Sequence, residues 1–176
     1  MRSEERAAIL SSTPQVIVMD SVPSPRIAAE INGMLCKTDD ANSCFYDEHT
    51  RGGAPLPTIK TLLSDSRVHA LVGRGRVFGV VAISKKADAQ FVGLRALCVA
   101  HDVRGQRHGD ALLNEVKRNY HDIELSVWLD GHSRDRLLRF YRRHGFSDSH
   151  DVGRYRIMRH LADPVKDASD VFRAST

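Results

Sequence analysis

Residues 97–113 have the sequence LCVAHDVRGQRHGDALL, which predicts a buried strand, a tight turn and the start of an amphipathic helix. The strand is the apolar run that ends at Val99, the turn contains Gly105, and the helix begins at about His108. A junction of this kind directs several backbone N–H groups and the positive end of a helix dipole into one small space. The stretch therefore predicts a binding site for a phosphate or a pyrophosphate.

A second motif, FYRRHGF at residues 140–146, places Tyr141 four residues before Gly145. The spacing of the apolar residues predicts a helix that runs from Ser133, as its N-cap, to His144. Gly145 is suited to end that helix. The motif therefore predicts an aromatic hydroxyl near the end of a helix.

The composition is that of one globular domain: the chain has 176 residues, 41% hydrophobic and 27% charged. We expect the domain to cover residues 1–162 and a loosely ordered tail to cover residues 163–176. The N-terminus has no apolar run of signal-peptide length, and no window approaches the roughly 20 apolar residues of a membrane span. We therefore expect a soluble, cytoplasmic protein without a membrane partner.

The charge, the cysteines and the histidines give no indication of a nucleic-acid-binding, disulfide-bonded or metal-binding protein. A net charge of +4 and an isoelectric point near 9.1 suit an anionic ligand but are too mild to indicate nucleic acid alone. The cysteines Cys36, Cys44 and Cys98 form no CxxC pair, so neither disulfides nor zinc are predicted, and Cys98 is expected to be buried in its strand. The nine histidines show no HxH or HExxH spacing, so no metal site is predicted.

Strands and helices are predicted along the whole chain. Alternating or continuous apolar runs predict strands over residues 15–20, 68–72, 77–84, 90–99, 123–129 and 155–161, with further strand material at Phe146. Helical spacing predicts helices over residues 26–35, 58–63, 108–120 and 133–144. Residues 36–57 are expected to be a lid or disordered, and residues 73–76 and 85–89 to be turns. The order β-α-α-β-β-β-α-β-α-β predicts an α+β sandwich.

The hexapeptide RGQRHG at residues 104–109 resembles the phosphate-binding motif Q/R-x-x-G-x-G/A of the GNAT acyltransferase superfamily. The preceding LCV, the following ALL and the Tyr-x-x-x-Gly-Phe of residues 141–146 resemble the same family. The resemblance covers about Val77 to Leu161, and the N-terminal third matches only in element order. It implies a GNAT-like fold, in which a mixed, mostly antiparallel central sheet is flanked by helices as an α/β/α sandwich.

Two departures from the family pattern stand out. Arg107 replaces the first motif glycine, which normally lets the chain approach the pyrophosphate closely. Its side chain could crowd the site, swing outward, or reach a phosphate as a charged fork. An asparagine is frequent after the family's fifth strand, about four residues past a valine and seven before the tyrosine. In this chain those two positions hold Gly131 and Arg134, and the asparagine is absent. These departures favour a degenerate binding or regulatory module, whereas intact Arg104 and Tyr141 favour an enzyme.

The resemblance implies acetyl-CoA or another acyl-CoA as co-substrate, and direct attack by a primary amine without a covalent enzyme intermediate. The implied coenzyme-binding residues are Leu97, Cys98, Val99, Arg104, Gly105, Gln106, Arg107, His108, Gly109 and Asp110. The N–H of Val99, at a splayed strand end, is the implied oxyanion donor, and Tyr141 would protonate the leaving thiolate. The alternative for Tyr141 is a packed aromatic whose hydroxyl bonds solvent or backbone.

The sequence leaves open the base that accepts the proton of the amine. Glu124 and Ser126 share one face of the strand over residues 123–129, and Ser126 stands where some relatives carry glutamate. Glu124 would serve directly or through water, or it is a solvated strand carboxylate. His101 and His132 flank the expected cleft as alternatives. No strong base is required if the acceptor arrives partly deprotonated.

The predicted function is therefore transfer of an acetyl or short acyl group from coenzyme A to an amine. The acceptor is open among a small amine, a protein amine and aminoacyl-tRNA, and a homodimer through the late strands, common in the family, is also open. A nucleic-acid modifier is the remaining alternative, and it rests on arginines that could equally be solvated or meet the 3′-phosphate of the coenzyme. These are Arg134, Arg136, Arg139, Arg142 and Arg143.

Overall fold

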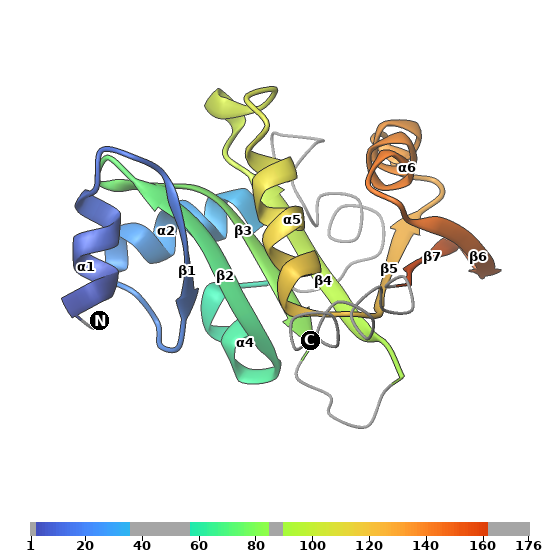
Figure 1. Cartoon of the computed structure of the whole chain (residues 1–176), viewed down its shortest axis with the longest axis horizontal. Coiled ribbons are helices and arrows are strands. Elements are labelled where there is room, and N and C mark those ends of the chain that lie inside the picture. Colours follow the sequence, from blue (N-terminus) through green and yellow to red (C-terminus); the bar gives the residue numbers. More distant parts are fainter. Residues whose placement is uncertain (1–2, 36–56, 85–89, 162–176) are drawn as a thin grey trace, which may run out of the picture.

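The computed structural model describes residues 3–35, 57–84 and 90–161, and Figure 1 shows how their elements are arranged. The described helices are α1 (Ser3–Leu10), α2 (Pro25–Leu35), α4 (Ile59–Asp65), α5 (His108–Asn119) and α6 (Arg134–Arg143), and η1 (His101–Val103) is a 3-10 turn. The strands are β1 (Gln15–Met19), β2 (Ser66–Gly73), β3 (Arg76–Ser84), β4 (Val92–Val99), β5 (Ile123–Trp128), β6 (Ser147–Val152) and β7 (Tyr155–His160).

Several predictions fall on parts of the chain that are not described. The expected lid over residues 36–57 lies outside the described residues except for Pro57, and Cys36 and Cys44 lie outside with it. The expected turn over residues 85–89 and the tail over residues 163–176 also lie outside. The division into a domain and a tail therefore stays a prediction.

The described strands form one seven-stranded sheet in the order β1-β2-β3-β4-β5-β7-β6. Every neighbouring pair is antiparallel except β4 and β5, which run parallel. Every residue of β3 from Val77 to Ile83 is buried, as is typical of a strand covered on both faces. Helix α5 crosses the front of the sheet in Figure 1, and α2 lies behind it. This arrangement confirms the predicted GNAT-like α+β fold.

The two covering helices bury the apolar stripes that their sequences predict. Residues spaced three or four apart share a helix face, and that face turns to the sheet. The buried residues of α2 and α5 are Ile27, Ile31, Met34, Leu35, Leu112, Leu113 and Val116. These contacts hold the N-terminal end of α5 close to the end of β4.

Strands β4 and β5 are paired only over their first residues. Their register joins Val92 to Ile123 and ends where Leu94 faces Leu125. On its other side, β4 stays paired with β3 as far as Val99. The last residues of β4 therefore diverge from β5, and their backbone groups on that side are directed into the gap between the strands.

Two elements differ from the sequence-based expectation. Helix α1 was not predicted, and it is held by tertiary contacts such as the hydrogen bond from the Gly75 N–H to the Ile9 carbonyl at 2.7 Å. Instead of the expected single last strand there is a hairpin of β6 and β7. All residues of β6 are exposed, so burial does not require an apolar alternation in its sequence. At α6, Ser133 occupies the N-cap position without a capping side-chain bond, and Gly145, at φ +84°, follows its end as predicted.

Candidate active site

The turn between β4 and α5 contains backbone conformations that L side chains rarely adopt. Gly105 has φ +83°, and Arg107, the N-cap of α5, has φ +62°. Arginine has no acceptor atom with which to cap a helix, so no N-cap side chain covers the amides of the first turn of α5. Arg104 holds the turn against the strand, because its Nε donates to the carbonyl of Val99 at 3.2 Å. The geometry has the features of an anion-binding site at a helix N-terminus.

Arg107 occupies a left-handed position with a side chain, which costs about 1 kcal/mol relative to glycine. Its side chain is 86% exposed, and its Nε donates to Oδ2 of Asp110 at 3.0 Å. Because so much of it is exposed, the side chain lies at the rim of the turn and does not fill the space above the amides. The sequence-based alternative in which Arg107 crowds the site is therefore not the arrangement observed.

Asp110, in the first turn of α5, joins that helix to α6. Its Oδ1 lies 2.9 Å from Nε2 of His144 and 3.3 Å from the guanidinium of Arg143. Burial alone would raise the pKa of Asp110, but hydrogen bonds from Arg107 and His144, aided by the charges of His144 and Arg143, outweigh it and lower the pKa. An ionised carboxylate only accepts hydrogen bonds, so Nε2 of His144 carries a proton.

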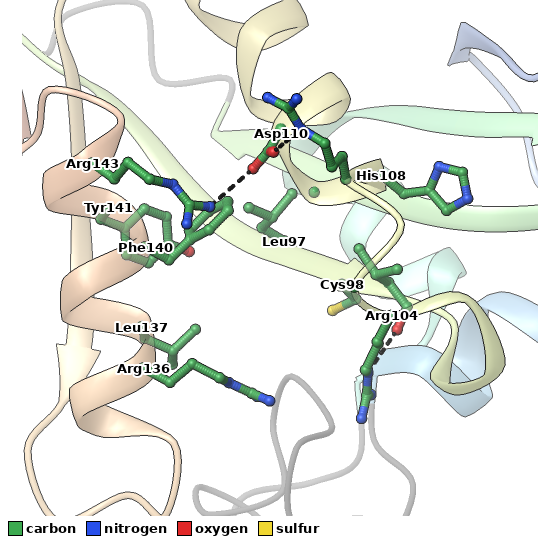
Figure 2. A pocket seen from close by; sticks show the side chains of 14 residues that line it. Leu97, Cys98, Arg104, His108, Asp110, Arg136, Leu137, Phe140, Tyr141 and Arg143 are labelled. Atoms are coloured by element: carbon green, nitrogen blue, oxygen red, sulfur yellow. Dashed lines mark hydrogen bonds and ion pairs between the residues drawn. The ribbon is translucent and has the colours of Figure 1, made fainter.

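A cavity of about 620 Å³ lies between α6 and the β4–α5 junction. Figure 2 shows Leu137, Phe140 and Tyr141 on α6 facing Leu97 and Cys98 on β4 across this space. The lining residues are Leu97, Cys98, Val99, Arg104, Gly105, Arg107, His108, Gly109, Asp110, Arg136, Leu137, Phe140, Tyr141 and Arg143. The lining thus combines apolar side chains of β4 and α6 with the residues of the turn and four arginines.

Val99 and Tyr141 meet at this cavity from two different elements. The N–H of Ala100 donates to the carbonyl of Phe78 on β3, at 2.9 Å. Because successive residues of a strand point their N–H groups to opposite sides, the N–H of Val99 is directed away from β3, toward the gap where β4 and β5 diverge. Tyr141 is buried, 7% exposed, with its ring against Phe140 and Phe146 at centroid distances of 5.3 and 5.6 Å.

Most of the predicted site residues line the cavity, but three do not: Gln106, Glu124 and Ser126. Glu124 accepts a hydrogen bond from Nε of Arg159 at 2.8 Å, and both side chains of this pair are half-buried. The predicted roles of Glu124 and Ser126 stay predictions. Likewise, His101 in η1 is exposed and does not line the cavity.

Two lining residues of α6, Leu137 and Phe140, were not among the predicted site residues. Their spacing with Tyr141, three and four positions apart, is the signal that could have found them, since it places all three on one helix face. His108, at the start of α5, was predicted and does line the cavity. Burial lowers the pKa of His108, whose ring lies 5.2 Å from that of Phe78. Neutral imidazole is therefore favoured at this position.

Acidic partners offset three of the five arginines of α6. Arg134 pairs with Asp135, Arg142 pairs with Asp148, and Arg143 pairs with Asp110. Arg136 and Arg143 line the cavity. This distribution favours a ligand in the cavity over nucleic acid along the helix.

Two further searches gave negative findings for the described part of the chain. No three or more His, Cys, Asp or Glu side chains come together there as metal ligands. Among the described helices, none combines the length and the apolar content that crossing a membrane requires.

Residues 64–148 match the family model of the acetyltransferase (GNAT) domain. This match spans the predicted motif turn and all of α6. Comparison with curated protein sequences found no match. The family match agrees with the fold and with the motif residues, so this part of the chain is similar to a GNAT acetyltransferase domain.

Solved structures share this fold at low sequence identity. The PaiA N-acetyltransferase of Thermoplasma acidophilum, in complex with coenzyme A, has a TM-score of 0.55 and 14% identity over 84% of this chain and 99% of its own. A Desulfovibrio desulfuricans protein described as a GNAT-family acetyltransferase has a TM-score of 0.61 and 16% identity over 84% and 99%. Aminoglycoside 6′-acetyltransferase type Ii has a TM-score of 0.61 and 14% identity over 85% of this chain and 99% of its own. At these identities the likeness shows the fold.

Proposed function

We propose that this protein transfers an acetyl or short acyl group from coenzyme A to a primary amine. The observation that carries the proposal is one cavity whose lining includes Val99, Tyr141 and residues of the turn before α5. The family match supports it, as does the likeness in fold to a T. acidophilum N-acetyltransferase in complex with coenzyme A. The acceptor is proposed only as an amine.

The cavity fits the chemistry of an acyl-CoA. Its volume of about 620 Å³ lies within the range of roughly 300–1,000 Å³ that is usual for ligand pockets. Leu97, Leu137 and Phe140 supply an apolar channel suited to a pantetheine arm. The turn over residues 104–109 supplies amides suited to a pyrophosphate. A Cβ at Gly109 would meet only ordinary contacts of 3.5–3.7 Å, so the alanine that the family motif also permits there would fit.

When bound, the coenzyme supplies a thioester whose carbonyl carbon is the electrophile and whose sulfur is the leaving group. The N–H of Val99 donates to the carbonyl oxygen as negative charge develops on it. Tyr141 donates its phenolic proton to the sulfur as the C–S bond breaks and the C–N bond forms. The nitrogen of the acceptor loses one proton, so a neutral amide and a thiol leave. Tyr141 recovers its proton from solvent.

In this proposal Glu124 receives the amine proton through intervening water, because it does not line the cavity itself. Arg159 holds the Glu124 carboxylate by its hydrogen bond and lies over the Phe91 ring at 4.4 Å. The ion pair keeps the carboxylate oriented on the face of β5 opposite to its buried residues. Ser126 lies on the same face, where it can hold the water.

The experiment that tests the proposal begins with thermal unfolding in millimolar acetyl-CoA. A ligand at 100 times its dissociation constant stabilises the folded state by about 2.7 kcal/mol, which raises the Tm measurably. A panel of primary amines with a free-thiol readout then tests transfer, and mass spectrometry of the acceptor confirms the new amide. A Tm that does not move with acetyl-CoA would overturn the proposed function.

A further inference from the structure

The lining of the cavity adds positively charged side chains to the amides of the turn. Its described lining includes one carboxylate, Asp110, and four arginines: Arg104, Arg107, Arg136 and Arg143. Two of these, Arg107 in the turn before α5 and Arg143 in α6, converge on the carboxylate of Asp110. Figure 2 shows the guanidinium of Arg143, on α6, directed toward Asp110. Such convergence of two guanidinium groups on one anion is the arrangement that binds phosphate.

We propose that Arg107 and Arg143 form a clamp for a phosphate group of the coenzyme, and that Asp110 is the positioning residue that holds both arginines in place until the phosphate binds. The inference rests on the proposed function, since it assumes that the ligand is a coenzyme A thioester. It goes further by assigning a role to the one motif position at which this chain departs from the family glycine.

The two arginines have the exposure that an incoming anion requires. Their side chains are 86% and 67% exposed, whereas the side chain of Asp110 between them is 15% exposed. Ion pairs of exposed arginines contribute little stability, so the guanidinium groups can turn from the carboxylate to a phosphate at small cost. A phosphate offers more acceptor oxygens and more charge than a carboxylate, which favours that exchange.

Other contacts hold the clamp without depending on the ligand. The guanidinium of Arg143 lies 5.6 Å from the centre of the Phe140 ring. Asp110 is also bonded to His144, so its carboxylate keeps its place when the arginines move. Lys117 in turn donates to the carbonyl of His144 at 3.1 Å, which fixes the end of α6 on α5.

The clamp explains why the left-handed position tolerates arginine. Glycine at this position lets a ligand approach the backbone closely, whereas a side chain displaces it outward. A guanidinium attached at the same point can recover the lost contact by reaching the phosphate itself. The substitution thus exchanges backbone approach for a charged side-chain contact.

The test measures binding of coenzyme A, dephospho-coenzyme A and pantetheine by isothermal titration calorimetry. We expect Arg107→Gly and Arg143→Ala each to weaken coenzyme A binding about ten-fold or more, the scale of a charge-assisted hydrogen bond. Pantetheine, which carries no phosphate, should bind all variants equally. Arg118→Ala is the matched control, because Arg118 is an exposed α5 arginine paired with Glu115 and does not line the cavity.

The ligand series identifies the phosphate. If the loss disappears with dephospho-coenzyme A, the clamp binds the 3′-phosphate, and if it persists, the clamp binds the pyrophosphate. An Arg107→Gly variant that binds coenzyme A as tightly as the wild type, or more tightly, overturns the clamp while the proposed function stands. Failure of the wild type to bind coenzyme A overturns both.

The role of Asp110 is tested by a double-mutant cycle. Asp110→Asn removes the charge that anchors the arginines, so Arg107→Gly should cost less affinity in that background than in the wild type. Strictly additive effects on the dissociation constant would contradict a positioning role. Circular dichroism and the Tm of each variant confirm that the fold is intact.

Discussion

Replacing Tyr141 by phenylalanine isolates the phenolic hydroxyl from the ring that carries it. The ring is 7% exposed and lies edge-on to Phe140 and Phe146, at 5.3 and 5.6 Å between centroids. Phenylalanine retains these apolar contacts, so the free energy of unfolding should fall by no more than about 1 kcal/mol, the usual net value of one hydrogen bond. The coenzyme should bind with nearly unchanged affinity.

Turnover should respond quite differently to Tyr141→Phe. Proton donation by a positioned side chain is worth about 10²- to 10⁴-fold in rate, or about 3–5 kcal/mol of activation free energy. We therefore expect kcat to fall by at least about 100-fold, while the dissociation constant for acetyl-CoA changes little. The assay combines steady-state thiol release with calorimetric binding and chemical denaturation of the same protein samples.

The matched control is Tyr120→Phe, the same chemical change at the far end of α5. The Tyr120 hydroxyl lies 3.2 Å from Nε2 of the buried His69 and does not line the cavity. This variant should lose about 1 kcal/mol of stability and keep its kcat. The catalytic role of Tyr141 is refuted if Tyr141→Phe turns over like the wild type, or if both variants lose turnover in proportion to lost stability.

Three further predictions concern the sheet. Gly79→Ala should destabilise the fold by about 1–3 kcal/mol in chemical denaturation, because a Cβ there would lie 2.7 Å from the carbonyl oxygen of Cys98. Val99→Pro removes the N–H directed away from β3 without removing a β3–β4 bond, so kcat in the thiol assay should fall about 100-fold or more. Burial lowers the pKa of His69 from 6.5. The free energy of unfolding should therefore be highest with respect to this group above pH 6.5 and should decline as the pH falls below that value.

Each of these predictions has a control that should behave differently. Gly33→Ala, in helix α2 with no heavy atom near the added Cβ, should stabilise by about 0.5–1 kcal/mol, and a Gly79 variant as stable as wild type would contradict the packing argument. Ala100→Pro should lose stability, because its N–H bonds Phe78. His69→Gln should make the free energy of unfolding depend less on pH below pH 6.5. Part of the dependence should remain, because burial also lowers the pKa of His108. An unchanged slope would contradict the assignment to His69.

The order of elements could be predicted from the sequence wherever the signal is local. The bounds of α5 and β5 follow from apolar spacing, and Gly145 follows the end of α6 in the left-handed conformation expected of it. Helix α1 and strand β6 could not be found this way. Their residues carry little amphipathic pattern, and hydrogen bonds to distant segments hold them.

The site was predictable in part for the same reason. The turn residues from Arg104 to Asp110 were found because they are contiguous and have turn and helix-start chemistry. The residues of α6 that complete the cavity, Leu137 and Phe140, were missed because their role depends on where α6 lies relative to β4. Gln106 was predicted from its motif position and does not line the cavity.

The sequence by itself determined the strand-turn-helix at residues 97–113 and the helix that carries Tyr141, because periodicity and turn chemistry act over a few neighbouring residues. Only the tertiary structure decided that β4 leaves β5 after Leu94, and that this divergence brings Tyr141 to the turn. It also decided that Asp110 pairs with both Arg107, in the turn before α5, and Arg143, in α6. These contacts join residues far apart in the chain, and only the packing of the whole sheet and its helices specifies such distances.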